Sequence, residues 1–220
     1  MQRRATIDLE DLLERGLNEL QLALPRTTQQ RLLAFLTLLE RWGRVYNLTA
    51  IRDPAQAVVH HLLDALSVLP ILMQRFDLTR ERVADVGSGA GIPGLVLAIA
   101  EPLMQLHSIE SVGKKAAFQR QVCAELGLSR VVVHAARVES IRQPCRLVLT
   151  RAFATLSETL KSTSELLVPQ GTLVAMKGQH QDTADEISQL RERYDVETIP
   201  LTVPGLEAER HLVLVGPRVF

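Results

Sequence analysis

Residues 83–95 constrain the fold of this chain more strongly than any other stretch. Residues 83–86 have strand character, glycines follow at positions 87, 89 and 91, and an apolar segment comes next. Glycine adopts left-handed backbone angles at low cost and leaves no Cβ between the backbone and a ligand. Pro93 suits the start of a helix, whose free N–H groups would face whatever lies over the loop. The stretch therefore predicts a strand, a loop and a helix that together bind a nucleotide-like ligand.

The spacing of the glycines distinguishes between classes of cofactor. The dinucleotide pattern G-x-G-x-x-G is not the one present, because the loop reads G-x-G-x-G with Asp85 just ahead of it. This spacing is typical of S-adenosylmethionine (SAM) enzymes, although a plain glycine-rich turn can also produce such a short motif. Asp85 lies inside an apolar strand, so we expect it to be partly buried and to accept hydrogen bonds from N–H groups of the loop. Its expected role is to hold the loop rather than to react.

Strands and helices alternate after residue 80. The expected strands are 83–86, 105–109, 131–134, 147–150 and 172–176, and the expected helical segments are 92–100, 114–126, 137–142, 156–167 and 182–193. This alternation predicts parallel strands joined by crossover helices in a doubly wound α/β sheet. The chain then changes pattern, because 196–203 and 210–215 flank a Pro-Gly turn and form a hairpin. We therefore expect the Rossmann-like SAM-dependent methyltransferase fold, a mostly parallel seven-stranded sheet with an antiparallel last strand.

The first 80 residues predict helices instead of strands. Apolar stripes indicate helices over 7–22 and 28–46, and in the second of them Trp42 and Tyr46 are four residues apart and should stack against the same neighbour. A third helix is expected to begin at Asp53-Pro54 and to bend or end at Pro70. Residues 1–80 should therefore form a helical cap packed on a methyltransferase domain at 81–220, as one continuous unit.

Composition argues against several classes of protein. No uninterrupted apolar run reaches the roughly 18 residues of a membrane span, and residues 1–8 do not resemble a secretory signal. Cys123, Cys145 and the six histidines show no metal-ligand spacing. Nine Lys/Arg against six Asp/Glu give residues 81–152 a charge of +3, and six against ten give residues 153–220 a charge of −4. We expect a cytoplasmic monomer with no metal and no membrane partner, and without indiscriminate affinity for polyanions.

The candidate site lies beyond the carboxyl ends of the strands, where open α/β sheets bind ligands. This rule selects the glycine loop after the first strand and Glu110 after the second. It also selects residues 137–139 after the third strand and Arg151 after the fourth. Glu110 could accept hydrogen bonds from two ribose hydroxyls, or it could be a solvated loop acid. Glu139 is explained equally well as an acid at a helix start.

Six stretches of the chain resemble one family. They read YNLT at 46–49, HLLDALS at 61–67, DVGSGAGIPG at 85–94, RAFA at 151–154, MKG at 176–178 and ERHL at 209–212. Together they resemble the glucose-inhibited division protein B family of bacterial methyltransferases. The resemblance implies SAM as cofactor and N7 of a guanine in 16S ribosomal RNA, nucleotide 527, as the methyl acceptor. The RNA could be naked, in the small ribosomal subunit or in an assembly intermediate.

The resemblance also implies roles for individual residues. SAM contacts are implied at Gly87, Ile92, Val138, Glu139 and Arg151, and the glycine motif adds Gly89, Gly91 and Glu110. Basic positions near cofactor and RNA fall on Lys114, Arg137, Lys177 and Arg210, which are candidates for substrate positioning. Arg137, Arg151, Lys177 and Arg210 come from four separate stretches and should converge on one rim. Two residues depart from the family pattern, because Glu110 stands where aspartate is more frequent and Met176 replaces a leucine.

The expected chemistry requires no catalytic base. Guanine N7 carries a lone pair and no proton, so positioning of the two reactants is sufficient. N7 lies on the Hoogsteen edge, so the guanine should be unpaired or flipped. Phe153 and Tyr46 are available for base stacking, although Phe153 could equally be core, and His61 could either pack in the cap or have a functional role. Two alternatives remain open: a small-molecule SAM methyltransferase with the helical segment as a lid, and a non-catalytic SAM-binding module.

Overall fold

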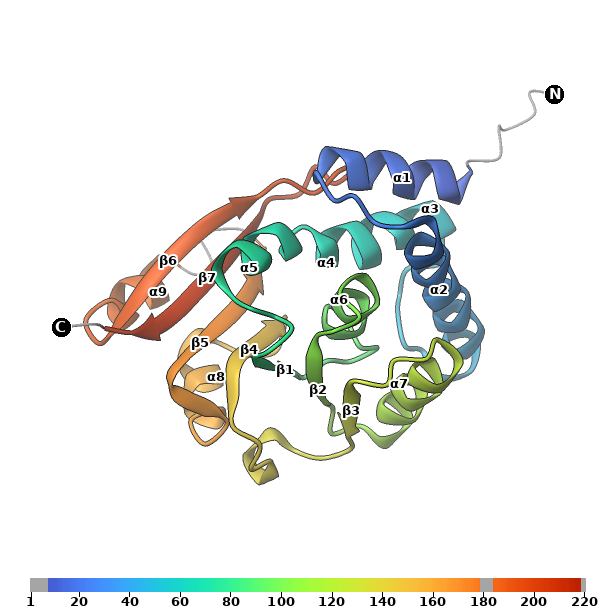
Figure 1. Cartoon of the computed structure of the whole chain (residues 1–220). Helices are drawn as coiled ribbons and strands as arrows, with labels where there is room; N and C mark the ends of the chain where they lie inside the picture. Colours follow the sequence, from blue (N-terminus) through green and yellow to red (C-terminus); the bar gives the residue numbers. More distant parts are fainter. Residues whose placement is uncertain (1–7, 179–183, 219–220) are drawn as a thin grey trace.

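A seven-stranded sheet forms the centre of the computed structural model, which describes residues 8–178 and 184–218 (Figure 1). The strands are β1 (Arg82–Val86), β2 (Gln105–Ile109), β3 (Val131–His134), β4 (Cys145–Arg151), β5 (Leu167–Lys177), β6 (Tyr194–Leu201) and β7 (Arg210–Pro217). Their order across the sheet is β3-β2-β1-β4-β5-β7-β6. Neighbours among β1 to β5 pair in parallel, whereas β7 runs antiparallel to both β5 and β6. The predicted mostly parallel sheet with an antiparallel last strand is confirmed.

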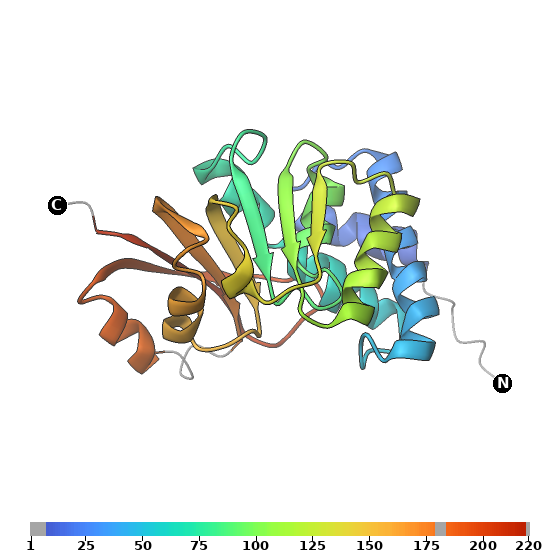
Figure 2. The ribbon, with the colours of Figure 1, turned by 90° about the horizontal axis from the view of Figure 1, so that it is seen from below.

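Helices cover both faces of the sheet (Figures 1 and 2). One face carries α6 (Gly94–Ala100) and α7 (Gly113–Glu125), and the other carries α8 (Leu156–Ser162) and α9 (Ala184–Leu190). A strand between two helical layers must be apolar on both sides. In β1 every residue from Val83 to Val86 is buried, and this explains why Asp85, the acid among them, must find a partner.

The N-terminal helices lie on the same side of the sheet as α6 and α7. They are α1 (Leu9–Glu19), α2 (Arg26–Tyr46), α3 (Pro54–Ala57), a π-helical segment η1 (Val58–Leu63), α4 (Asp64–Leu66) and α5 (Leu69–Arg75). Their buried side chains share one apolar core with α6, α7 and the adjacent strands. The rings of Trp42 and Tyr46 lie 5.4 Å from each other, and Trp42 also lies 5.7 Å from Phe118 of α7, so the two rings pack on one another rather than side by side on one neighbour. The cap is therefore joined to this face of the sheet by a shared hydrophobic core.

Several predicted boundaries are wrong. The helix expected over 156–167 ends at Ser162, and β5 begins at Leu167, before the expected position 172. Pro169 and Gly171 lie in an irregular first part of β5, where the register against β4 shifts and a missing N–H is tolerated. The helix expected at 92–100 begins at Gly94, and the segment at 137–142 reduces to a 3-10 helix, η2 (Val138–Ser140). Residues 182–183 of the last expected helix lie outside the described part of the chain.

The third predicted helix is longer than expected. It begins at Pro54 with Asp53 as its N-cap, as predicted. The run does not end at Pro70: it is interrupted by a turn at residues 67–68, and Pro70 lies in the first turn of α5. By length and composition alone, the run Pro54–Arg75 could cross a membrane, which the uninterrupted apolar runs of the sequence did not indicate. Of its most apolar window, 61% is buried within the protein, and core helices of soluble proteins pass the same test. The run is therefore weak support for a membrane span.

Candidate cofactor and substrate site

The loop between β1 and α6 has the backbone that its glycines predict. Gly87, Gly89 and Gly91 have φ angles of 66°, 58° and 81°. The N–H groups of Gly87 and Ser88 both donate to the carbonyl oxygen of Ile109, which ties the loop to β2. A Cβ added at Gly89 would meet no atom closer than 4.0 Å. The outer side of the loop is therefore bare backbone facing open space.

Asp85 anchors the helix that follows the loop. Its side chain is completely buried, and Oδ2 accepts a hydrogen bond of 2.8 Å from the N–H of Gly94, the first residue of α6. Oδ1 has no hydrogen-bond partner. Burial raises the pKa of Asp85 to about 7, against the lowering effects of the Gly94 hydrogen bond and the Arg151 charge. We had expected N–H groups of the loop as donors, but the donor is the N–H of Gly94 at the start of α6. Asp85 thereby holds the loop at its junction with the helix, in agreement with the expected role.

A buried polar cluster supports the loop from below, and sequence reasoning missed it. The side chain of Gln119 in α7 is fully buried, and its Nε2 donates to the carbonyl oxygen of Gly89 and to Ser88 Oγ, both at 2.8 Å. Ser108 Oγ in β2 donates to Gln119 Oε1 at 2.7 Å and lies 2.9 Å from Ser88 Oγ. The sequence feature that could have indicated this cluster is the amide side chain of Gln119 on the otherwise apolar buried face of α7. The cluster fixes the loop in one conformation.

Glu110 is a buried carboxylate beside the loop and not a solvated acid. It is 5% exposed. Its Oε2 accepts a hydrogen bond of 2.9 Å from the N–H of Gly89, and its Oε1 accepts one of 2.7 Å from the N–H of Val112. An ionised carboxylate has about four acceptor positions. Each oxygen of Glu110 therefore keeps capacity for a further donor such as a hydroxyl.

A crevice of about 80 Å³ lies where the strand order reverses, between the loop and η2. It is lined by Val86, Gly87, Ile109, Ser111, Ala136, Arg137, Val138, Glu139 and Phe153. It brings together four of the predicted site residues: Gly87, Arg137, Val138 and Glu139. Ile92 is not in the crevice, because its side chain packs in the apolar core.

The residues of the crevice and the loop fit the parts of SAM. Ile109 and Val138 offer apolar walls for a flat adenine ring, Glu139 offers a carboxylate in the crevice, and Glu110 offers one beside the glycine loop. The bare backbone at Gly89 offers close approach to an amino-acid tail. The donor and acceptor groups present at this end of β1 are therefore those that an adenosyl amino acid requires.

A second cavity, of about 340 Å³, lies beside the crevice at the same edge of the sheet. It is lined by Asp64, Arg151, Ala152, Met176, Lys177, Gly178 and Arg210. Arg151 ends β4 and Lys177 ends β5, while Arg210 begins the antiparallel β7, so the three cations meet at one edge. Arg137 lines the crevice instead, and Lys114, exposed in the first turn of α7, lines neither space. We call this second space the basic cavity.

Asp64 joins two of these cations, and sequence reasoning gave it no role. Its side chain is 3% exposed. Oδ2 accepts a hydrogen bond of 3.0 Å from Arg151 Nη1, and Oδ1 accepts one of 3.2 Å from Arg210 Nε. Arg151 Nη1 also donates to the carbonyl oxygen of His60 at 3.1 Å. The sequence feature that could have indicated this role is a carboxylate in the apolar stretch 58–69, because a buried charge must be paired.

The segment between Arg151 and α8 has an unusual backbone. Ala152 has a φ of 50°, in the left-handed region that non-glycine residues rarely adopt. Phe153 is 39% exposed, and Lys177 Nζ donates to the carbonyl oxygen of Ala154 at 2.9 Å. Burial lowers the pKa of Lys177, and the nearby Glu186 carboxylate opposes this effect. The crevice and the basic cavity therefore meet at residues 151–153.

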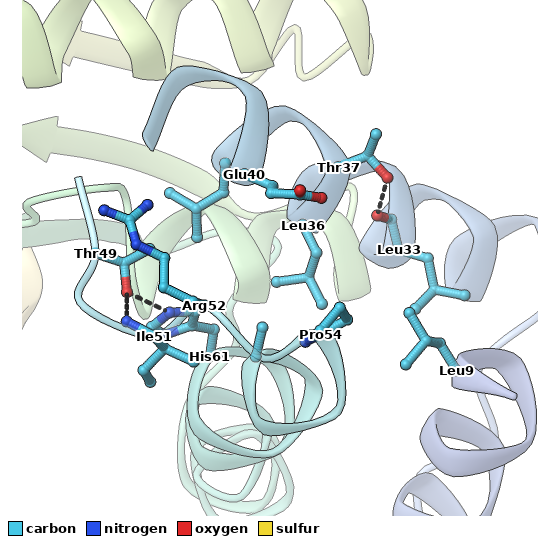
Figure 3. A pocket seen from close by; sticks show the side chains of 12 residues that line it. Leu9, Leu33, Leu36, Thr37, Glu40, Thr49, Ile51, Arg52, Pro54 and His61 are labelled. Atoms are coloured by element: carbon cyan, nitrogen blue, oxygen red, sulfur yellow. Dashed lines mark hydrogen bonds between the residues drawn. The ribbon is translucent and has the colours of Figure 1, made fainter. Parts of the chain in front are cut away.

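His61 lies in the cap rather than in either space. Figure 3 shows it below the 49–52 connector, at the wall of a largely apolar cavity of about 130 Å³ between α1, α2 and α3. Its Nε2 lies 2.9 Å from Thr49 Oγ1. Burial, followed by the positive charge of Arg151, lowers the pKa of His61 to about 4. His61 is therefore neutral at pH 7 and hydrogen-bonded across the cap, which is the first of the two roles considered.

No metal site is found among the residues that the structure describes. No group of three or more His, Cys, Asp or Glu side chains there could hold an ion, and His180 lies outside that part of the chain. Both cysteines are free, and burial raises the pKa of each thiol to about 11.

The fold and the site define a Rossmann-like SAM-dependent methyltransferase. Magnesium protoporphyrin IX methyltransferase from Synechocystis PCC 6803, solved with bound SAM, matches with a TM-score of 0.60 at 16% identity, covering 97% of this chain and 100% of that one. A methyltransferase from Geobacter sulfurreducens matches with a TM-score of 0.56 at 14% identity, covering 83% and 90%. At these identities the likeness shows the fold alone.

The family follows from closer relatives. The family model described as rRNA small subunit methyltransferase G matches residues 28–213. The ribosomal RNA small subunit methyltransferase G of Aromatoleum aromaticum is 50% identical over 210 residues, which cover 92% of this chain and 96% of the relative. That of an Azoarcus species is 46% identical over 204 residues, covering 91% and 93%. The chain belongs to the rRNA small subunit methyltransferase G family, and the resemblance found in the sequence is confirmed. It is a SAM-dependent methyltransferase, and SAM is its cofactor.

Proposed function

We propose that this protein transfers a methyl group from SAM to N7 of one guanine of 16S rRNA, nucleotide 527 by family resemblance, and that it acts in the cytoplasm as a monomer. The relatives are named for the RNA of the small ribosomal subunit. The observation that carries the proposal is the convergence of Arg151, Lys177 and Arg210 on the basic cavity, directly beside the cofactor crevice.

The cofactor would be held mainly by backbone and carboxylates. Glu110 would accept hydrogen bonds from the ribose hydroxyls through the acceptor positions that Gly89 and Val112 leave free. Glu139 and Val138 would flank the adenine, and the backbone of residues 87–92 would approach the amino-acid tail. Arg151, pinned by Asp64, would place a positive charge near the carboxylate of that tail. Bound SAM supplies a methyl group on a sulfonium, which a lone pair can take without prior loss of a proton.

The basic cavity would hold the RNA backbone. Phosphate groups are bound by Lys and Arg side chains whose donors remain available. Within the described residues, Arg210 uses Nε and Nη1 on protein acceptors and keeps Nη2 for a ligand, and Arg151 keeps Nε and Nη2. Exposed Lys114 and Arg137 would extend the positive surface along the same edge. Since N7 needs no base, these residues would act by fixing the guanine in line with the methyl group.

A small-molecule substrate is less well supported. A lid over a small substrate should place an apolar pocket against the cofactor crevice. The apolar cavity of the cap shares no lining residue with the crevice, and the space that adjoins the crevice is basic. This arrangement favours a polyanionic substrate over an apolar one.

The test uses methyl-labelled SAM with deproteinised small-subunit RNA, and separately with small subunits, from a strain lacking this protein. We expect label on a single guanine N7. Arg210→Ala and Lys177→Ala should each lower transfer at least about 10-fold while SAM affinity stays near wild type, because each removes one charged contact worth about 1.5–3 kcal/mol. Arg26→Ala is the control, since Arg26 is 81% exposed in the cap and distant from the basic cavity. Wild-type transfer by both variants would refute the role of the basic cavity, and label absent from both RNA and particles would refute the substrate.

A further inference from the structure

Phe153 presents an aromatic ring to solvent at the edge of the sheet that carries the site. It is 39% exposed and belongs to neither of the two apolar cores. Among the described residues, Tyr46 is the one other aromatic side chain exposed to this degree, and its ring packs on Trp42 in the cap. The sequence left open whether Phe153 is core or surface. The structure shows that its ring contributes little to the core and is available to a ligand.

The backbone holds the ring of Phe153 firmly in place. Ala152 adopts its left-handed conformation at a cost of roughly 1–2 kcal/mol, and such strain persists only where the surroundings enforce it. On the other side, Lys177 Nζ binds the carbonyl oxygen of Ala154, and Thr155 forms a capping box with Glu158 at the start of α8. The ring is therefore carried by a short segment fixed at both ends.

The position of the ring relates it to both parts of the site. It lies against Gly87, since a Cβ added there would stand 2.2 Å from Phe153 Cδ2. Phe153 lines the cofactor crevice, while its neighbours Arg151 and Ala152 line the basic cavity. A nucleotide with its phosphate in the basic cavity would therefore bring its base next to this ring. That base would also lie next to the loop over which the cofactor binds.

We propose that Phe153 is the stacking platform for the target guanine, a positioning residue that sets the plane of the unpaired base; this inference rests on the proposed function. Unpaired bases of RNA are held by aromatic side chains, at about 1–3 kcal/mol per base on alanine substitution. A phenylalanine ring offers a face and no hydrogen bond. Phe153 therefore orients the guanine, and the identity of the base is read by other groups.

The test distinguishes the effect of the flat aromatic ring of Phe153 from the effect of its apolar volume. Phe153→Leu keeps an apolar side chain of similar size, and Phe153→Tyr keeps the ring. With saturating SAM and RNA, we expect Phe153→Leu to lower kcat about 10- to 100-fold, the factor that corresponds to about 1.4–2.8 kcal/mol of stacking. Phe153→Tyr should stay within about 3-fold of wild type, and the SAM Kd of both variants should be unchanged. Tyr46→Leu, which removes the other exposed ring, should leave kcat unchanged.

A second measurement reports on the base itself. RNA with 2-aminopurine at the target position should lose fluorescence on binding to the wild type and to Phe153→Tyr, because stacking quenches this base, but not on binding to Phe153→Leu. Wild-type kcat for Phe153→Leu would overturn the inference while the proposed function stood. A loss confined to SAM affinity, with kcat restored at saturating SAM, would also overturn it, since the ring would then serve the cofactor. If the wild type labels no guanine, the proposed function fails and this inference fails with it.

Discussion

The two arginines held by Asp64 predict a large effect of one substitution in the cap. Asp64→Ala removes a carboxylate that is 3% exposed and leaves Arg151 and Arg210 without their common partner. Loss of one member of a buried ion pair costs about 3–5 kcal/mol. The side chains of Arg151 and Arg210 are 27% and 24% exposed, so water can reach them, and we expect the lower end, about 3 kcal/mol.

The assay is equilibrium unfolding in urea together with a thermal scan. For a chain of 220 residues, about 1 kcal/mol corresponds to about 2–4 °C, so Tm should fall by about 6–12 °C. Asp64→Asn should fall between wild type and Asp64→Ala, because an amide can still accept from one arginine but presents a donor to the other. Glu40→Ala is the matched control. It breaks the exposed Arg44–Glu40 pair and should change stability by less than about 0.5 kcal/mol.

The double variant isolates the interaction itself. If Asp64 and Arg210 act as one unit, the loss in Asp64→Ala/Arg210→Ala should be smaller than the sum of the single losses by about 1–3 kcal/mol. Additive losses, or an Asp64→Ala variant within about 0.5 kcal/mol of wild type, would refute the reasoning.

Two further predictions concern the glycine loop and the cap. Gly87→Ala should lower the free energy of unfolding by more than Gly89→Ala, because both substitutions impose roughly 1–2 kcal/mol of backbone strain at φ angles of 66° and 58°, but only the Cβ at Gly87 would also collide with Phe153. Gly89→Ala should in turn weaken SAM binding at least about 10-fold, measured by calorimetry, because its Cβ would occupy the open space through which the cofactor approaches the loop. Equal effects of the two would contradict this. In the folded protein the pKa of His61 is lowered to about 4. Below pH 6.5 the unfolded protein therefore takes up a proton at His61 that the folded protein does not. The contribution of His61 to stability is present above pH 6.5 and is lost towards pH 4. Unfolding free energies of the wild type minus those of His61→Gln should therefore fall by up to about 3 kcal/mol between pH 6.5 and 4, and a constant difference would show the reasoning to be wrong.

Local patterns predicted most of the sheet and the cofactor loop. The glycines at 87, 89 and 91 can adopt left-handed backbone angles at low cost whatever surrounds them, so the loop could be predicted before any packing was known. The convergence of Arg151, Lys177 and Arg210 could be predicted because the hairpin at the end of the chain reverses the last strand. The start of β5 could not be predicted, because Pro169 and Gly171 are residue types that are usual in turns. They are tolerated in the strand because the register between β4 and β5 is irregular there.

The contacts that depend on docking of the cap were beyond the sequence. Asp64 is 146 positions from Arg210, and nothing in the helix pattern around it indicates which cation it meets. Gln119 is a similar case, because its two acceptors on the loop become neighbours only when α7 packs beside β2. In both cases the sequence shows only a polar group in an apolar setting. Its partner is a property of the tertiary structure.

The place of β7 inside the sheet bears on how the protein is made. During synthesis β5 leaves the ribosome long before its neighbour, so its edge has open hydrogen-bonding groups until residues 210–217 arrive and insert between β5 and β6. Synthesis of this strand also supplies Arg210, which pairs with Asp64. A polypeptide interrupted before residue 210 would thus lack both a closed sheet and a finished basic cavity. Release of a competent enzyme is in this way tied to completion of translation through its last strand.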